Sequence, residues 1–153
     1  MNVNLTIIKL GILDLKSCIE LDQKSLNGLW TKSQWEKELT NGKRICIGVL
    51  DKETKKLLGL ASAWIVIDEL QITSFAVYPE HQRKGLGKLL MADLIKRSKS
   101  ILIHHMHLEV KDKNEPAKAF YKSMGFVIVG KRLNFYKDGN DALILEKHLN
   151  AKS

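Results

Sequence analysis

The segment 82–88, which reads QRKGLGK, combines residue types suited to binding an anion. An apolar run that predicts a strand precedes it, and leucines at helical spacing follow it. Two glycines allow a tight turn and a close approach of the backbone to a ligand. The first N–H groups of the helix have no partner within it, and with the helix dipole they attract anions. The alternative is an ordinary helix start with solvated basic residues. We expect a phosphate-binding loop made of Arg83, Lys84, Gly85, Leu86, Gly87 and Lys88.

A carboxylate and a phenol form a second group that could do chemistry. Glu109 lies late in a predicted strand of apolar residues and histidines, where a charge is costly without a partner or a task. A plain alternative is that Glu109 pairs with Lys111 or with a neighbouring histidine. Tyr121 lies on the apolar face of a predicted helix and should therefore point inward. A carboxylate that accepts a proton and a phenol that donates one would suit general acid–base catalysis.

The order of predicted elements can bring these groups together. We expect strands at 4–10, 45–50, 57–67, 71–78, 101–111, 126–131 and 142–149, and helices at 11–23, around Trp35, from Gly85 to about 100, and at 115–124. This order predicts a mixed α/β fold with one central, mostly antiparallel sheet of about seven strands and helices on both faces. The helical crossover from strand 71–78 to strand 101–111 should make these two strands parallel neighbours. We expect residues 1–153 to form a single domain.

Three segments resemble the GNAT acetyltransferases, in particular the RimI-type enzymes. The spacing Gln-x-x-Gly-x-Gly after a strand is similar to the pyrophosphate loop of this family, which binds acetyl-coenzyme A. Residues 108–126, LEVKDKNEPAKAFYKSMGF, resemble the family's LEVR-x-x-N-x-x-A-x-x-L-Y-x-x-x-GF segment. Residues 132–149 resemble its C-terminal hairpin, although Phe135 stands where a tyrosine is common and Asn140-Asp141 where an acidic pair is usual. The likeness is good from about residue 68 to 149 and weaker before it.

The resemblance implies an acetyl-CoA-dependent N-acetyltransferase that acts on the N-terminal amine of a protein, for RimI-type enzymes the N-terminal alanine of a small-subunit ribosomal protein. It implies direct attack in a ternary complex, with Glu109 as the general base. Tyr121 could then protonate the departing thiolate as the general acid. The resemblance also implies that main-chain groups of Phe75, Ala76 and Val77 hold the pantetheine arm and that Asn114 contacts the coenzyme.

Composition is that of an ordinary globular protein, with 44% hydrophobic and 27% charged residues. No apolar run approaches the ~20 residues of a membrane span, and no basic leader precedes an apolar segment, so we expect neither membrane insertion nor a signal peptide. Cys18 and Cys46 suggest reduced core cysteines and a cytoplasmic location.

The net charge of +8 is concentrated in the second half of the chain. Residues 79–153 carry 15 basic and 8 acidic side chains, a net charge of +7. A basic face can serve a polyphosphate coenzyme or a nucleic acid. Because aromatic and basic residues do not interleave as they do where bases stack, we expect the coenzyme and no specific nucleic acid, while a ribosomal surface stays open as a secondary partner.

Other residues have competing interpretations. His105, His107 and Glu109 share one strand face, with neighbours in the series ~6.6–7 Å apart. Three such residues in a row on one straight strand do not converge on one ion, so we expect no metal. Trp30 and Tyr136 could border the acceptor groove, with core packing and a solvent-facing position as the respective alternatives.

We expect a monomeric enzyme. Its competitors are an acetyltransferase for a small amine or a lysine side chain, and a non-catalytic protein that binds coenzyme A or associates with RNA. A protein that only binds has no need of both Glu109 and Tyr121, which disfavours the last of these.

Overall fold

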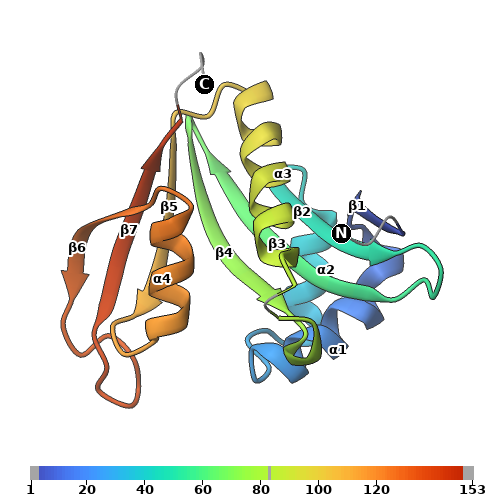
Figure 1. Cartoon of the computed structure of the whole chain (residues 1–153), viewed down its shortest axis with the longest axis horizontal. Helices are drawn as coiled ribbons and strands as arrows, with labels where there is room; N and C mark the ends of the chain where they lie inside the picture. The colour runs from blue at the N-terminus through green and yellow to red at the C-terminus, as the bar shows by residue number, and fades with distance from the viewer. Residues whose placement is uncertain (1–3, 83, 150–153) are drawn as a thin grey trace.

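The computed structural model describes residues 4–82 and 84–149. Within them the elements follow the predicted mixed α/β order (Figure 1). The strands are β1 Leu5–Lys9, β2 Arg44–Asp51, β3 Leu57–Val66, β4 Glu69–Val77, β5 His105–Lys111, β6 Val127–Arg132 and β7 Ala142–His148. The helices are α1 Leu15–Ser25, α2 Lys32–Thr40, α3 Leu86–Ser100 and α4 Glu115–Ser123, and the short 3-10 turns are η1 Ile12–Asp14 and η2 Pro79–His81.

The seven strands form one sheet in the order β1-β2-β3-β4-β5-β7-β6. All neighbours are antiparallel except β4 and β5, which are parallel as the helical crossover between them predicted. The expected sheet of about seven mostly antiparallel strands is therefore confirmed.

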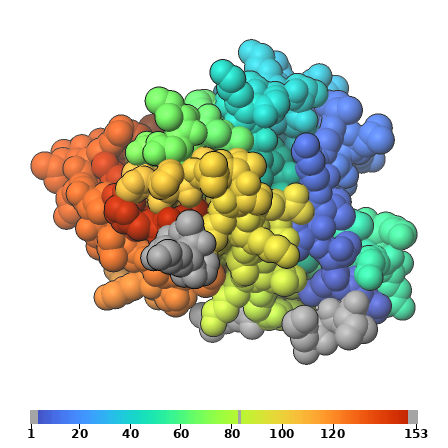
Figure 2. Space-filling view, turned by 90° about the horizontal axis from the view of Figure 1, so that it is seen from above, coloured from blue at the N-terminus to red at the C-terminus, as the bar shows by residue number. Residues whose placement is uncertain are grey.

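Helices cover both faces of the sheet, as predicted (Figure 1). On one side α1 and α2 pack on β2, β3 and β4 around the fully buried Leu21, Trp35 and Leu60. On the other side α3 and α4 enclose the larger core, which includes Leu90, Met91, Leu94, Met106, Leu108, Val110, Leu143 and Leu145. Seen from above, the end of β7 lies beside the end of α3 and the segment that leads into β5 (Figure 2).

The strands β4 and β5 are hydrogen-bonded to each other at one end only. Within the described residues they pair over Glu69–Gln71 and His105–His107 and then diverge (Figure 1). We call the diverging part, residues 73–77 of β4 and 108–111 of β5, the fork. A register shift between Ser62 and Ala63 leaves Thr73 as the extra residue of β4, and such a bulge bends the strand that carries it. The bulge therefore helps β4 to turn away from β5.

The start of β5 differs from the prediction. The sequence pattern placed a strand at 101–111, but β5 begins at His105. Leu102 has a φ of 63°, which belongs to the left-handed region and cannot continue a strand. Residues 101 and 102 therefore end the connection from α3, where their side chains are exposed.

Candidate active site

The glycine loop has the expected conformation at the start of α3. Gly85 caps the helix with a φ of 81°, a left-handed value that glycine adopts without steric cost. A Cβ atom at Gly85 would meet nothing within 4 Å, so the space beside it is open. The buried side chain of Leu86 anchors the first turn, while Lys84 and Lys88 are exposed. Arg83, which we predicted to bind phosphate, lies outside the described residues.

Gly87 has a different role from Gly85. A Cβ atom at this position would lie 3.2 Å from the Cε1 and Cζ atoms of Phe120 and 3.8 Å from Cε1 of Phe75. The absence of a side chain therefore lets the first turn of α3 lie against α4. The rings of Phe75 and Phe120 are 5.6 Å apart, so β4, α3 and α4 meet at this point.

Main-chain groups of β4 face the fork. The N–H group of Tyr78 donates to the carbonyl of Leu58 on β3 at 3.0 Å. Because successive antiparallel residues face opposite ways, Ala76 directs its main-chain groups toward β3, whereas Phe75 and Val77 direct theirs toward the fork. The carbonyl of Val77 accepts from Gln82 Nε2 at 3.0 Å, which ties the glycine loop to the end of β4. Only two of the three predicted pantetheine residues thus present backbone groups to the fork.

Glu109 lies on β5 where the strand borders the fork. Its neighbours Leu108 and Val110 are buried beneath α3 and α4, and because side chains alternate along a strand, Glu109 points to the opposite face. Its Oε2 atom is buried and has no hydrogen bond within the described residues, and it lies 4.0 Å from Nε of Arg132. The alternative pairing with Lys111 is wrong, since Lys111 instead contacts Asp138 at 3.0 Å.

Tyr121 points inward from α4, as its helical position predicted. Its ring contacts three others, with centroids 6.0 Å from Phe75, 5.3 Å from Phe120 and 5.8 Å from Phe126. Burial raises the pKa of Tyr121 further above its ordinary value. The phenol is therefore protonated near neutral pH, and the same burial makes it a weaker acid than a free phenol.

Asn114 joins β5 to α4 and caps the helix. Its Oδ1 atom accepts from the N–H of Ala117 at 3.2 Å, and its own N–H donates to the carbonyl of Lys111 at 2.9 Å. The side chain is exposed, and the capping bond uses only its oxygen. The amide NH₂ group can therefore reach a ligand that approaches α4.

A buried carboxylate that the sequence did not reveal holds the loop between α1 and α2. Asp22 is 1% exposed and accepts from the N–H of Leu29 at 2.7 Å, the N–H of Trp30 at 3.1 Å and Nε1 of Trp35 at 2.8 Å. The rings of Trp30 and Trp35 are 4.7 Å apart. Trp35 belongs to the core, whereas Trp30 is half-buried at its edge, where it can still border an acceptor.

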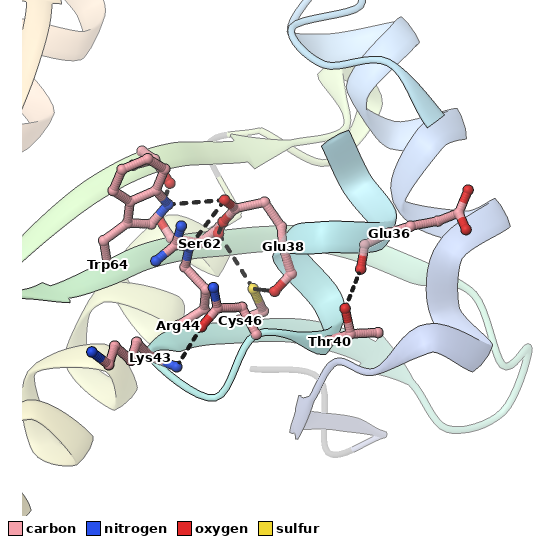
Figure 3. Close-up of polar contacts among 10 residues, drawn as sticks. Glu36, Glu38, Thr40, Lys43, Arg44, Cys46, Ser62 and Trp64 are labelled. Carbon is pink, nitrogen blue, oxygen red and sulfur yellow. Dashed lines mark hydrogen bonds and ion pairs between the residues drawn. The ribbon is translucent and has the colours of Figure 1, made fainter. Parts of the chain in front are cut away.

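A second buried carboxylate fastens α2 to the sheet (Figure 3). Glu38 Oε1 accepts from Nε of Arg44 at 3.1 Å and from Nε1 of Trp64 at 2.9 Å, and its Oε2 accepts from Oγ of Ser62 at 2.9 Å. Both acids lie on amphipathic helices, where an acidic residue normally indicates a solvated face. Only the tertiary packing shows that they are buried and fully used.

The cysteines are buried free thiols, as expected. Burial is the main reason why the pKa of Cys18 rises to about 12 and why the pKa of Cys46 is also raised. Neither is a thiolate near neutral pH, so neither is an effective nucleophile.

Tyr136 lies in the hairpin between β6 and β7 and is half-buried. Burial raises its pKa, and the nearby charges of Glu109 and Asp138 raise it further. The hairpin therefore places this tyrosine near Glu109. Its side chain is neither buried nor fully exposed, and Nζ of Lys111 lies 5.1 Å from the centroid of its ring.

Comparison with known proteins agrees with this geometry. Residues 13–126 match the Acetyltransferase (GNAT) family. The chain therefore belongs to the GNAT family, and it is an acetyl-CoA-dependent N-acetyltransferase. None of the helices in the described ranges is long and apolar enough to cross a membrane.

The names of its relatives specify an acceptor as well as a reaction. The chain is 34% identical over 133 residues to a putative ribosomal protein bS18-alanine N-acetyltransferase of Bacillus subtilis, covering 86% of this chain and 87% of that protein. It is 31% identical over 143 residues to the corresponding Escherichia coli enzyme, covering 92% and 95%. The crystal structure of the Escherichia coli ribosomal-protein-S18-alanine N-acetyltransferase matches with a TM-score of 0.88 at 28% identity over 95% of this chain and 94% of that one. The fold is also similar to that of the PaiA N-acetyltransferase of Thermoplasma acidophilum in complex with coenzyme A, with a TM-score of 0.79 at 22% identity over 97% and 99%.

Proposed function

We propose that this single-domain enzyme transfers the acetyl group of acetyl-CoA to the N-terminal alanine of the small-subunit ribosomal protein bS18. Two relatives named for this activity are 31–34% identical to this chain over most of its length, which supports the acceptor. The observation that carries the chemistry is the placement of Glu109 and Tyr121 on opposite faces of the sheet, one on each side of the fork.

The residues around the fork fit a coenzyme. The left-handed Gly85 and the open space beside it leave the first N–H groups of α3 accessible to an anion. Lys84 and Lys88 add full charges, and Arg83 belongs to the same basic segment. The pyrophosphate would bind there. The fork-facing main-chain groups of Phe75 and the N–H group of Val77 would bind the pantetheine arm, because the Val77 carbonyl already accepts from Gln82 Nε2 and Ser25 Oγ. Ala76 contributes only its side chain in this arrangement.

The two proton transfers take place on opposite faces of the sheet, one at Glu109 and the other at Tyr121. A protonated N-terminal amine, with a pKa of about 8, must lose a proton before it can attack the thioester. Glu109 Oε2 has no hydrogen bond within the described residues, so it is available to accept this proton directly or through water. Tyr121, kept protonated by burial, donates its proton to the coenzyme thiolate as it leaves. The amine approaches from the Glu109 side, between Trp30 and Tyr136, and the coenzyme from the α3 and α4 side.

A ribosomal acceptor also agrees with the cytoplasmic location and with the basic charge expected from the sequence. It places the enzyme in the cytoplasm, where two free buried thiols are stable. The net charge of +7 on residues 79–153 would favour approach to a ribosomal surface. We propose that the active species is a monomer, since each chain carries the whole set of site residues.

The acceptor is tested with three substrates at equal concentration. These are a peptide with the bS18 N-terminus, the same peptide with a blocked N-terminus and an added lysine, and spermidine. We expect thiol release from acetyl-CoA and a mass increase at the N-terminal residue with the first peptide only. Turnover of spermidine or of the lysine with none of the free N-terminus would replace the proposed acceptor with a small amine or a side chain.

A further inference from the structure

Three potential metal ligands lie close together where β5 begins and β7 ends. His105 opens β5, and Glu146 and His148 lie at the end of β7. His105 Nδ1 is 2.7 Å from Glu146 Oε1, and His148 Nε2 is 3.5 Å from the same oxygen. One ligand atom from each of the three residues lies within 4.8 Å of the other two. They share the sheet face of Glu109 but lie at the paired end of β4 and β5, away from the fork.

The strand register explains this convergence. His105 is directly opposite His148, and Glu146 is two pairs further along, opposite His107. Side chains on adjacent strands are ~4.5–5.5 Å apart at Cβ when opposite, closer than residues two apart on one strand. His105, His107 and Glu109 follow one another along a single strand. In the proposed set, His105 lies opposite His148, and Glu146, two residues from His148 on β7, lies diagonally across from His105.

We propose that His105, Glu146 and His148 bind a divalent transition-metal ion of the zinc class. Imidazole and carboxylate ligands are suited to Zn²⁺, and sets of two histidines and one glutamate hold it in proteins. Two ligands ~2.1 Å from one tetrahedral ion lie about 3.4 Å apart. The 3.5 Å separation of Glu146 and His148 already fits this value, and the 2.7 Å separation of His105 and Glu146 needs only a small opening.

The surroundings favour an ion that water can reach. The side chains of His105, Glu146 and His148 are 29%, 18% and 71% exposed, so the site is open on one side and a water molecule can complete the coordination. The ring of His107 stacks on that of His105 at 6.2 Å. His107 Nε2 is buried without a hydrogen bond within the described residues and lies 3.5 Å from Oε1 of Glu69. A third imidazole, whose Nε2 makes no hydrogen bond within the described residues, is thus already next to the proposed ligands.

The position gives the ion a structural role. His105 also pairs with Glu69 of β4, so the ion would link β5 to β7 beside the short stretch over which β4 and β5 pair. Glu109 is four residues further along β5, about 13 Å away along the strand. The ion would stabilise the closed end of the fork and would not contact the reacting groups.

Equilibrium dialysis of the metal-free protein against Zn²⁺, with Co²⁺ absorption as a second readout, tests this proposal. We expect one ion per chain, a higher melting temperature with Zn²⁺, and a d–d spectrum typical of nitrogen and oxygen ligands. His148→Ala, at a mostly exposed position, should fold normally and weaken binding at least about tenfold. Glu146→Gln should weaken it as well.

His81→Ala is the matched control, because His81 lies in η2 and outside the cluster. We expect this variant to bind Zn²⁺ like the unchanged protein. Absence of bound Zn²⁺ in dialysis would overturn the proposal, and so would equal binding by the His148→Ala and unchanged proteins. Because none of these readouts uses acetyl transfer, the result is independent of the proposed function.

Discussion

The ring of Phe120 lies against the backbone of Gly87, so closely that a Cβ atom at position 87 would be 3.2 Å from two ring carbons. Phe120 precedes Tyr121 on α4, and Gly87 follows the left-handed Gly85 at the start of α3. The contact therefore connects the proposed anion-binding turn to the helix that carries Tyr121, the proposed proton donor. We expect coenzyme binding and proton donation to change together when this contact is altered.

Gly87→Ala tests this coupling. The added methyl group must push the Phe120 ring by a few tenths of an ångström, and we expect a several-fold higher KM for acetyl-CoA together with a lower kcat. Phe120→Leu provides the partner for a double-mutant cycle, because a smaller side chain leaves room for the methyl group. Simple additivity of the two substitutions would contradict the proposed coupling.

Gly85→Ala should act through the backbone, since its added Cβ meets nothing within 4 Å. A non-glycine residue in the left-handed region costs roughly 1–2 kcal/mol. We expect a loss of this size in the free energy of unfolding, measured by urea denaturation. Unlike Gly87→Ala, this loss should not depend on the residue at position 120.

Glu109→Gln should lower kcat about 10²- to 10⁴-fold, because the amide keeps the shape of the side chain but cannot take the amine proton. The KM for acetyl-CoA should change little, since Glu109 faces away from α3 and α4. Glu36→Gln, at an exposed carboxylate on α2, is the control and should behave like the unchanged protein. Steady-state kinetics with a bS18 peptide measure both, and an unchanged kcat in Glu109→Gln would remove the carboxylate from the mechanism.

Tyr121→Phe should also reduce kcat by about 10²- to 10⁴-fold while the aromatic contacts around the ring persist. A coenzyme analogue with a more acidic leaving thiol needs less help from a proton donor. We therefore expect the defect to shrink with such an analogue, and an equal defect with both thioesters would indicate a purely positional role.

Asp22→Asn should weaken acceptor binding more than coenzyme binding. The amide cannot accept all three hydrogen bonds that hold Trp30 and the loop before α2, so we expect a loss of about 1–3 kcal/mol in unfolding free energy. The KM for the peptide should rise while the KM for acetyl-CoA is nearly constant. Glu20→Gln, exposed on the same helix, should change neither quantity.

Alkaline pH should destabilise the protein partly through Cys18. Burial raises the pKa of this thiol to about 12 in the folded state, compared with about 8.5 in an unfolded chain. The folded state therefore holds a proton that the unfolded state releases, and this stabilisation is complete below pH 8.5 and declines as the pH rises toward 12.

The expected decline is at most about 1.4 kcal/mol per pH unit from this one group. Melting temperatures at pH 8 and pH 10 under reducing conditions measure it. In Cys18→Ala the difference between the two pH values should be smaller than in the unchanged protein, whatever the cost of the cavity. An equal difference in both proteins would show that other groups account for the pH dependence.

Local patterns in the sequence determined much of this protein. The order of strands and helices, the glycine loop before α3 and the inward side of Tyr121 all follow from periodicity and from glycine and proline positions. Such features depend on residues near each other in the chain, and the chain alone therefore specifies them. The resemblance to the GNAT family rested on the same short segments.

Strand pairing and packing decided the rest. The separation of β4 and β5, the contact of Gly87 with Phe120, the burial of Asp22 and Glu38, and the meeting of His105 with His148 all join distant residues. The periodicity of hydrophobic residues shows which face of an element a side chain occupies. It does not show which strand lies beside that element or where two paired strands separate. For this reason the sequence identified Glu109 as a candidate base, whereas only the tertiary structure showed that Arg132 is its partner and that the fork separates it from Tyr121.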